Sequence, residues 1–254
     1  MDETRAVRAA VRPVWYAGGA TIWGELWTML HLPYTGMVLC FVVLGAVFSP
    51  TVSWSLLAIM LTLYFVGLGI GSHFLDQISG MGSKYSQSWS NRSLWAGGLA
   101  AIVGATAIGL WGSYYFLGPA VTALVGLQAF FAVAYPLAPV FRGWFHGDGV
   151  FAFSWATLPF LVSFVAQSGT ITLLALLTAG VLGAVGLLEI RLSRRARADR
   201  QRMRSAQPDE QRSETVRPAP FWVSERRIKW LVGATYAATV IAVLVRVIGG
   251  SAGT

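Results

Sequence analysis

The chain has 254 residues, of which 55% are hydrophobic and only 12% are charged, and its mean hydropathy is +0.59. A soluble domain carries roughly twice that charged fraction, so the composition excludes an ordinary soluble enzyme and indicates an integral membrane protein. The formal charge of +8 would suit nucleic acid, but the basic residues cluster between apolar runs, where orientation in a membrane explains them. We therefore expect no nucleic-acid partner.

The first segment, 1–27, carries acids beside its arginines and lacks an apolar core next to them, so it does not resemble a cleavable signal. We expect it to be a cytoplasmic N-terminal segment. The single cysteine, Cys40, lies in the apolar run that follows and has no partner for an intrachain disulfide. Nothing in the cysteine content therefore requires an oxidising compartment.

Apolar runs near the roughly 20 residues that a helix needs to cross a bilayer follow one another along the chain. They lie at 28–49, 53–72, 94–112, 116–135, 149–167, 170–190 and 230–248. Runs of this length favour helices over the short alternating strands of a membrane barrel. We therefore predict an all-α integral membrane helical bundle with about seven transmembrane helices.

The distribution of Lys and Arg predicts the orientation of this bundle. If the connections alternate between the two sides of the membrane, 18 of the 19 basic residues lie on the side of the N-terminus, and Arg246 lies on the other. Since cytoplasmic loops are rich in Lys and Arg, we predict a multi-pass plasma (inner) membrane protein with a cytoplasmic N-terminus and an outside C-terminus.

We divide the remaining chain into a six-helix membrane bundle at 28–190, a basic cytoplasmic loop at 191–229, and a seventh helix with the outside C-terminus at 230–254. The loop has few aliphatic residues and many Arg, Ser, Gln and Glu. It cannot bury much apolar surface, so we expect it to be partly disordered. Its basic residues would hold it near anionic lipid headgroups.

Acids are scarce in and beside the predicted spans, where ionisable groups are costly and often functional. Asp76, Asp148 and Glu189 are the candidates. In "GIGSHFLDQISG", His73 and Asp76 are three residues apart and would share a helix face. They are either the polar end of a helix or ligands of a metal ion.

Glu189, in "GLLEIRLSRR", ends the sixth run on the same predicted membrane side, with Arg191 and Arg194 next to it. Two carboxylates from different helices, Asp76 and Glu189, could hold one Mg²⁺ that bridges a diphosphate, while arginines bind the remaining oxygens. The alternative is that Glu189 only pairs with those arginines.

Two further loops on that side offer basic and polar groups. Lys84 and Arg92 follow Asp76, and "AYPLAPVFRGWFHGDG" supplies Tyr135 and Arg142. Such groups could stabilise the charge that develops on a departing diphosphate. The plain alternatives are that Arg142 sets topology and that Asp148 caps the fifth span.

Aromatic residues are abundant inside the spans, and most of them are explained by packing and by contact with lipid. Some aromatic faces could instead line an isoprenoid cavity and stabilise an allylic cation through their quadrupoles. In "FAFSWATLP" we select Trp155, with Phe153 beside it.

The order of these motifs resembles the UbiA superfamily of intramembrane prenyltransferases over roughly 28–200. His73, Asp76 and Gly80 occupy the places of the family's first Asp-rich motif, and "NRSL" at 91–94 resembles its Asn-Arg-Pro-Leu stretch. "AYPLAPVFR" resembles the segment of Tyr, Pro and a basic residue after the fourth helix. The resemblance implies that Arg92, Tyr135 and Arg142 bind a diphosphate.

The chain departs from that family at both Asp-rich motifs, because one carboxylate remains in each, Asp76 and Glu189. The resemblance implies a Mg²⁺-assisted prenyltransferase that acts on an isoprenoid diphosphate in the membrane, with Asp76, His73 and Glu189 as catalytic residues. The alternatives are a terpene cyclase without an acceptor and a non-catalytic protein that binds an isoprenoid or quinone. Members of the family usually have nine helices, so a homo-oligomer or a partner could complete the bundle.

Overall fold

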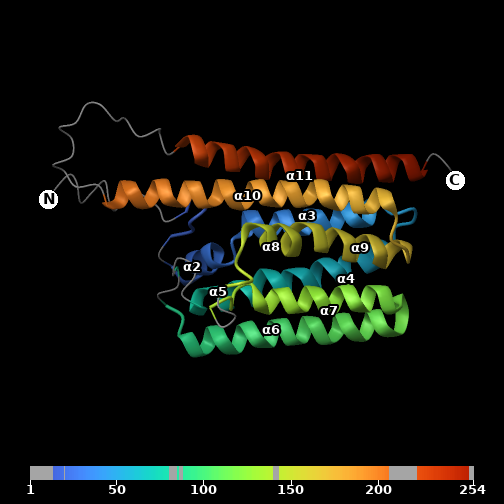
Figure 1. The fold of residues 1–254 in the computed structure, drawn as a ribbon, viewed down its shortest axis with the longest axis horizontal. Helices are drawn as coiled ribbons and strands as arrows, with labels where there is room; N and C mark the ends of the chain where they lie inside the picture. Colours follow the sequence, from blue (N-terminus) through green and yellow to red (C-terminus); the bar gives the residue numbers. More distant parts are fainter. Residues whose placement is uncertain are drawn as a thin grey trace.

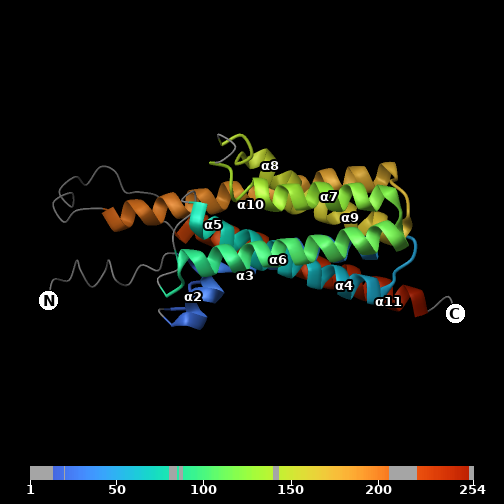
Figure 2. The ribbon, with the colours of Figure 1, turned by 90° about the horizontal axis from the view of Figure 1, so that it is seen from below.

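The computed structural model describes residues 14–19, 21–79, 85, 88–139, 143–205 and 222–251, and these residues form helices without any strand. The long helices run side by side along one axis (Figures 1 and 2). This confirms the all-α class that the hydrophobic runs predict.

The chain enters the bundle through two helices, α2 (Ile22–Met29) and α3 (Leu32–Val47), whose axes are bent by 45°. Thr21 caps α2 by accepting a hydrogen bond from the Gly24 amide at 3.1 Å. His31 stands at the bend and Pro33 lies in the first turn of α3, where a missing N–H costs nothing. The sequence gives no apolar run at α2, which lies largely within the segment expected to precede the bundle.

A continuous span then follows, made of α4 (Trp54–Tyr64), the π-helical segment η1 (Phe65–Ser72) and α5 (His73–Ser79). The next hairpin consists of α6 (Asn91–Gly112), η2 (Ser113–Leu117) and α7 (Pro119–Ala134). Gly118 links the last two elements with a φ of 92°, a conformation that a side chain would strain.

The second half of the chain contains α8 (Asp148–Ala152), η3 (Phe153–Thr157), α9 (Leu158–Ser168), α10 (Leu173–Ser205) and α11 (Trp222–Ser251). Gly147, rather than Asp148, is the N-cap of α8, and Asp148 is its first residue. The capping role expected for Asp148 is therefore wrong. Its carboxylate instead pairs with Arg194 at 2.6 Å.

Helix α10 does not stop at residue 190 but continues to Ser205, past the ends of its neighbours (Figure 1). The predicted loop at 191–229 is therefore helical at both ends, since α11 already begins at Trp222. Arg, Leu, Ala, Gln and Met are good helix formers, and they let the helix leave the apolar zone without unwinding. The part of that loop at 206–221 lies outside the described residues.

Within the described residues, five helical segments are long and apolar enough to cross a membrane, or six if the bent pair α2–α3 counts as one span. Helix α7 is apolar but shorter. Many large apolar side chains on these helices are exposed, including Val103, Leu174 and Val245. An apolar exterior of this extent indicates a protein embedded in a membrane.

The core of the bundle forms where α3 packs against α9. Phe41 and Phe160 are fully buried there. Gly45 permits the close approach of the two helices, because a Cβ at this position would collide with the carbonyl oxygen of Phe160. This packing fixes the relative position of the helices that end at the polar pocket described next.

Candidate functional site

A polar pocket of about 110 Å³ lies at the end of the bundle that carries α2, α5 and the extension of α10. Its walls come from the α2–α3 bend, the η1–α5 junction, the end of α7, the α8–η3 region and α10. The lining residues include His31, Tyr34, Thr35, Ser72, His73, Asp76, Tyr135, His146, Phe151, Trp155, Glu189, Ser193, Arg194 and Arg197. Side chains far apart in the sequence thus converge on one small space.

The η1–α5 junction places His73 and Asp76 in this pocket. π-Helical turns are rare and often occur at functional sites. Here the end of η1 is held by Ser72, whose hydroxyl donates to the carbonyl of Ala132 in α7 at 2.7 Å. Asp76 follows one turn later, and its carboxylate makes no hydrogen bond or ion pair with any residue that the structure describes.

His31 occupies the bend between α2 and α3 in a left-handed conformation, with φ 48° and ψ 42°. This region costs a non-glycine residue about 1 kcal/mol or more. The imidazole is buried and stacks on that of His73, with ring centroids 4.6 Å apart and planes inclined by 23°. The bend therefore directs a strained histidine toward the pocket.

Hydrogen bonds define which ring nitrogens of the two histidines carry protons. Thr35 Oγ1 lies 2.6 Å from the carbonyl of Leu30, to which it must donate, so it accepts from Nε2–H of His73 at 3.1 Å. In His31, Nδ1–H donates to the carbonyl of Met29 at 2.6 Å. Neutral rings therefore leave Nδ1 of His73 and Nε2 of His31 as acceptors.

Helix α10 contributes a carboxylate and two arginines. Glu189 is only 4% exposed and makes no hydrogen bond or ion pair within the described ranges. Arg194 is already bound, since it donates to the His146 carbonyl at 3.1 Å and pairs with Asp148. Arg197 lines the pocket without a hydrogen bond or close ion pair to the described residues, and its charge attracts the Asp76 carboxylate. Its guanidinium donors are therefore available to an anionic ligand.

Aromatic rings form the side of the pocket nearest α8 and η3. Trp155 stacks on Phe151 with centroids 5.8 Å apart and planes inclined by 10°, and it lies 5.4 Å from His73. Tyr135 stacks on His146 at 4.8 Å. Burial raises the pKa of Tyr135 and lowers the pKa of His146, so both side chains are uncharged near neutral pH.

A larger apolar cavity of about 320 Å³ lies between α4, α6, α7 and α9. No described residue lines both this cavity and the polar pocket, but η1 and the end of α7 contribute residues to each. Leu68 lines the cavity, and Ser72, one helical turn later, lines the pocket; Ala132 and Tyr135 have the same relation on α7. A polar head and an apolar tail of one ligand could therefore occupy neighbouring spaces.

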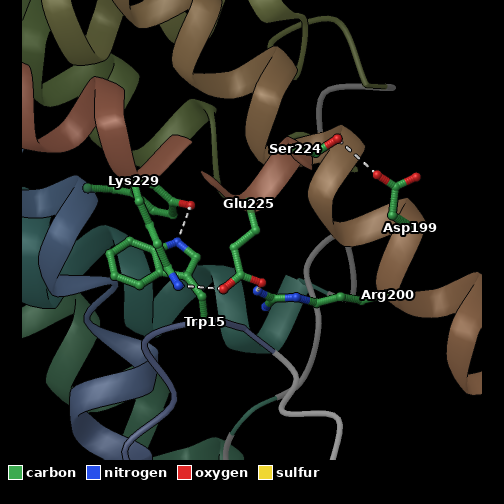
Figure 3. A network of polar contacts seen from close by, with 7 residues as sticks. Trp15, Asp199, Arg200, Ser224, Glu225 and Lys229 are labelled. Carbon is green, nitrogen blue, oxygen red and sulfur yellow. Dashed lines mark hydrogen bonds and ion pairs between the residues drawn. The ribbon is translucent and has the colours of Figure 1, made fainter. Parts of the chain in front are cut away.

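A network of polar contacts anchors the extension of α10 to α11 (Figure 3). Arg200 pairs with Glu225, which also binds Lys229 at 2.6 Å. Lys229 lies over the ring of Trp15, whose indole N–H donates to the Tyr34 hydroxyl at 3.3 Å. These contacts hold the helix turns that carry Arg194 and Arg197 beside the pocket.

Five of the sequence-predicted residues line the polar pocket: His73, Asp76, Tyr135, Trp155 and Glu189. The structure does not place the others there. Arg191 lies 3.7 Å from Asp148 and is largely exposed, and Arg92 is exposed in the first turn of α6. Phe153 packs on Phe131 at 5.7 Å, outside the linings of both cavities. Lys84 and Arg142 lie outside the described residues.

The sequence pointed to Arg194, near Glu189, but not to His31 or Arg197. Arg197 looked like part of a topogenic loop, although it continues the helix face of Glu189, Ser193 and Arg194. His146 lies in the same loop as Arg142 and also lines the pocket. His31 carries no local signal, because only the bend after α2 brings it to His73.

No group of three or more His, Cys, Asp or Glu side chains in the described ranges is arranged to hold a metal ion. A Mg²⁺ ion that binds phosphate needs only one or two carboxylates, since phosphate oxygens and water supply the remaining ligands. Asp76 and Glu189 are the two carboxylates among the residues that line this pocket.

In comparisons with protein-family models, curated proteins and solved structures, nothing matches this chain. The comparisons therefore identify no family. What the protein does must be inferred from the motifs in its sequence and from the chemistry of the two cavities.

Proposed function

We propose that the protein is a UbiA-like membrane prenyltransferase that binds an isoprenoid diphosphate and assists ionisation of its allylic carbon–oxygen bond. One observation carries this proposal: Asp76, Glu189 and Arg197 line a small polar pocket, and η1 and α7, which contribute to it, also line an apolar cavity. Ionisable groups are costly in a membrane protein, and Glu189 is buried while Asp76 and Arg197 are half-buried, so their convergence supports a charged ligand.

The polar pocket would hold the diphosphate. Arg197 would bind its oxygens directly, and Arg194 would do so from the turn that Asp148 holds in place. Asp76 and Glu189 would bind Mg²⁺, which would neutralise charge on the diphosphate and make it a better leaving group. The two arginines would stabilise the charge that remains on it.

The apolar cavity would hold the isoprenoid chain. It is lined almost entirely by apolar side chains of α4, η1, α6, α7 and α9. Tyr64 and Gln128, two polar residues in its wall, bond to each other at 3.3 Å, so they do not demand a polar ligand. At the junction with the polar pocket, the faces of Trp155 and Tyr135 would stabilise an allylic cation.

The finer membrane arrangement is part of the same proposal. Seven spans would result if the bent pair α2–α3 and the shorter α7 both cross the membrane. The polar pocket would then open at the cytoplasmic face of the plasma membrane, with the C-terminus outside. A second copy of the chain or another partner would complete the outer wall of the bundle.

Two alternatives from the sequence have support in particular features. A terpene cyclase without an acceptor would use the stacked rings of Phe151, Trp155 and His73 to guide a cation. A non-catalytic isoprenoid- or quinone-binding protein would agree with the absence of a three-ligand metal group among the described residues.

Ligand-induced thermal stabilisation tests the proposal. We expect farnesyl and geranylgeranyl diphosphates to raise the unfolding midpoint of the detergent-purified protein, more strongly with Mg²⁺ than without it. Asp76→Asn and Glu189→Gln should remove the effect of Mg²⁺. Arg197→Gln should weaken binding on the order of 10- to 100-fold, because a charge-assisted hydrogen bond is lost.

Arg195→Gln is the matched control, since Arg195 is exposed on the same helix and does not line the pocket. It should leave the ligand response unchanged. Equal stabilisation of all four variants and the wild type, with no influence of Mg²⁺, would contradict a diphosphate site. Stabilisation without release of diphosphate would favour the binding protein over the enzyme.

A further inference from the structure

Helix α2 carries large apolar side chains on the outside of the bundle. Ile22, Trp23 and Trp27 are exposed, and Trp23 is 76% exposed. Because Trp23 and Trp27 are four residues apart, they share one face of the helix. Glu25 and Thr28 are among the residues that α2 buries. The helix thus presents a tryptophan-bearing face that the described part of the bundle does not cover.

Polar contacts fix α2 at the level where α6 begins. The Glu25 carboxylate accepts hydrogen bonds from the amide of Ser88 at 3.0 Å and from its hydroxyl at 3.1 Å. Ser90, two residues later, is the N-cap of α6. Figures 1 and 2 place α2 at the end of the bundle from which α10 extends. The tryptophan-bearing face therefore lies near one end of the spanning helices.

Exposed aromatic residues on α6 and η2 indicate where the bilayer lies relative to this end. Trp95 is exposed near the start of α6, and Tyr114 is exposed in η2. At 1.5 Å per residue they are about 28 Å apart, which is close to the roughly 30 Å thickness of the hydrocarbon core. Trp and Tyr concentrate at the two membrane–water interfaces. This spacing puts α2 at the level of the lipid headgroups.

An open groove of about 570 Å³ lies beside α2, and Trp15, Trp23 and Trp27 are among the residues that line it. We call it the α2 groove. Its volume is within the range of ligand pockets, about 300–1,000 Å³. The Gly18 amide donates to Thr28 Oγ1 at 3.0 Å, which holds the segment before α2 against the helix. The groove is therefore formed by contacts within the protein itself.

A lysine of α11 adds positive charge at the edge of the α2 groove. The ammonium of Lys229 lies 5.3 Å from the centre of the Trp15 ring and 2.6 Å from the Glu225 carboxylate (Figure 3). Arg200 binds the same carboxylate, so two positive charges share one negative charge. The Lys229 side chain is 48% exposed, and an ammonium has three donors. An anion at this edge would meet an excess of positive charge.

We propose that the α2 groove binds the headgroup of an anionic phospholipid from the surrounding bilayer. Lys229 donates to the oxygens of the headgroup, and Trp23 and Trp27 pack against the glycerol and the first carbons of the acyl chains. An indole suits this depth because its ring is apolar and its N–H is polar. This inference does not depend on the proposed function.

The charge and the aromatic residues of the groove together select this ligand. No acidic side chain is among the described residues that line the groove. A zwitterionic headgroup would bring an ammonium group close to Lys229, and repulsion between like charges disfavours this arrangement. A soluble anion would leave Trp23 and Trp27 in contact with water. An anionic lipid satisfies both the lysine and the tryptophans.

The depth of α2 in the bilayer is the first part of the test. A nitroxide label at Ile22→Cys, in a Cys40→Ser background, reports this depth in bilayers of phosphatidylcholine and phosphatidylglycerol. Labels at Val103→Cys on α6 and Arg195→Cys on α10 are the references, since both positions are exposed. We expect the accessibility to oxygen, relative to a water-soluble nickel complex, to lie between the two references. A ratio equal to that of Arg195→Cys would place α2 in water and overturn the proposal.

The second part measures selectivity for the headgroup on the detergent-purified full chain. Phosphatidylglycerol should raise the unfolding midpoint of the wild type by a few degrees more than phosphatidylcholine with the same acyl chains does. Lys229→Gln should lose most of this difference, and Lys229→Arg should retain it because the charge is kept. Arg195→Gln is the matched control, since it removes one positive charge from α10 outside the groove.

The tryptophans are tested with a double variant, Trp23→Ala with Trp27→Ala, which changes only exposed side chains. It should weaken the response to both lipids, whereas Trp54→Ala, exposed in the first turn of α4, should not. Equal loss of selectivity in Lys229→Gln and Arg195→Gln would show that only overall charge matters and would overturn the site. Equal effects of the two lipids on the wild type would assign the groove to another occupant, such as residues 1–13 of the chain, and would also overturn it.

Discussion

At the scale of single residues, the charged groups of the polar pocket differ in how firmly they are held. Asp76, Glu189 and Arg197 make no hydrogen bond or close ion pair within the described residues, although the charges of Asp76 and Arg197 attract each other. Arg194, in contrast, is bound by Asp148 and the His146 carbonyl. The first set is available to a ligand, and Arg194 is oriented in advance. Preorganisation of this kind reduces the entropy that a ligand must lose on binding.

His146 should make stability depend on pH. Burial lowers its pKa below the ordinary value of 6.5. As pH falls through that value, the unfolded chain takes up a proton that the folded protein does not, so stability is present above pH 6.5 and is lost below it. We expect the unfolding midpoint of the wild type to fall more steeply between pH 7.5 and 5 than that of His146→Phe.

The phenylalanine keeps a ring beside Tyr135 and removes the titrating group, so the difference between the two slopes isolates His146 from the other histidines. Parallel curves for wild type and variant over this range would show that burial does not disfavour the charged form of this imidazole.

At the scale of helices, the elements that face lipid were predictable and those that shape the pocket were less so. Each predicted span overlaps a helical segment, because apolar composition acts on the whole run, although α7 is shorter than a spanning helix. Helix α2 is eight residues long and gives no such signal. The extension of α10 was missed because its charge suggested a loop, although helix propensity does not depend on hydrophobicity.

The candidate site likewise contains residues that the sequence predicted and residues that it did not. Asp76, Glu189 and His73 were found because polar groups at the ends of apolar runs are conspicuous. The distribution of Lys and Arg also predicted that these three residues lie on the same face of the membrane. The sequence could not indicate that His31 stacks on His73, because that contact depends on the 45° bend between α2 and α3.

Helix packing gives a prediction with a matched pair of glycines. Gly45→Ala should lower the unfolding midpoint, because the added Cβ would collide with the Phe160 carbonyl and separate α3 from α9. Gly104→Ala, on α6, meets no atom within 4 Å and should be neutral or stabilising by about 0.5–1 kcal/mol. Thermal unfolding of both variants in the same detergent measures this difference; similar destabilisation by both would contradict the close contact of α3 and α9.

At the scale of the whole molecule, charge and polarity divide the bundle along its length. The extension of α10 lies at one end of the bundle (Figure 1), and its Arg194 and Arg197 line the polar pocket. Arg246, in α11, binds the Pro50 carbonyl in the connection between α3 and α4. Which end faces the cytoplasm stays a prediction from the distribution of Lys and Arg.

Site-directed labelling can check that orientation. In a Cys40→Ser background, we expect a membrane-impermeant maleimide to label Gly147→Cys in inside-out vesicles and Thr170→Cys in right-side-out vesicles. Both positions are exposed, just before α8 and between α9 and α10. Labelling of both from the same side would contradict the predicted topology.

The apolar cavity has a consequence for how activity should be measured. Its walls include Ile59, Ile108 and Phe116, which are 54%, 56% and 71% exposed on the side of the bundle. The proposed ligand would enter sideways from the hydrocarbon phase, so occupancy would follow its mole fraction among lipids and not its concentration in the assay volume. Adding empty micelles or vesicles at fixed amounts of protein and ligand should therefore slow turnover by surface dilution.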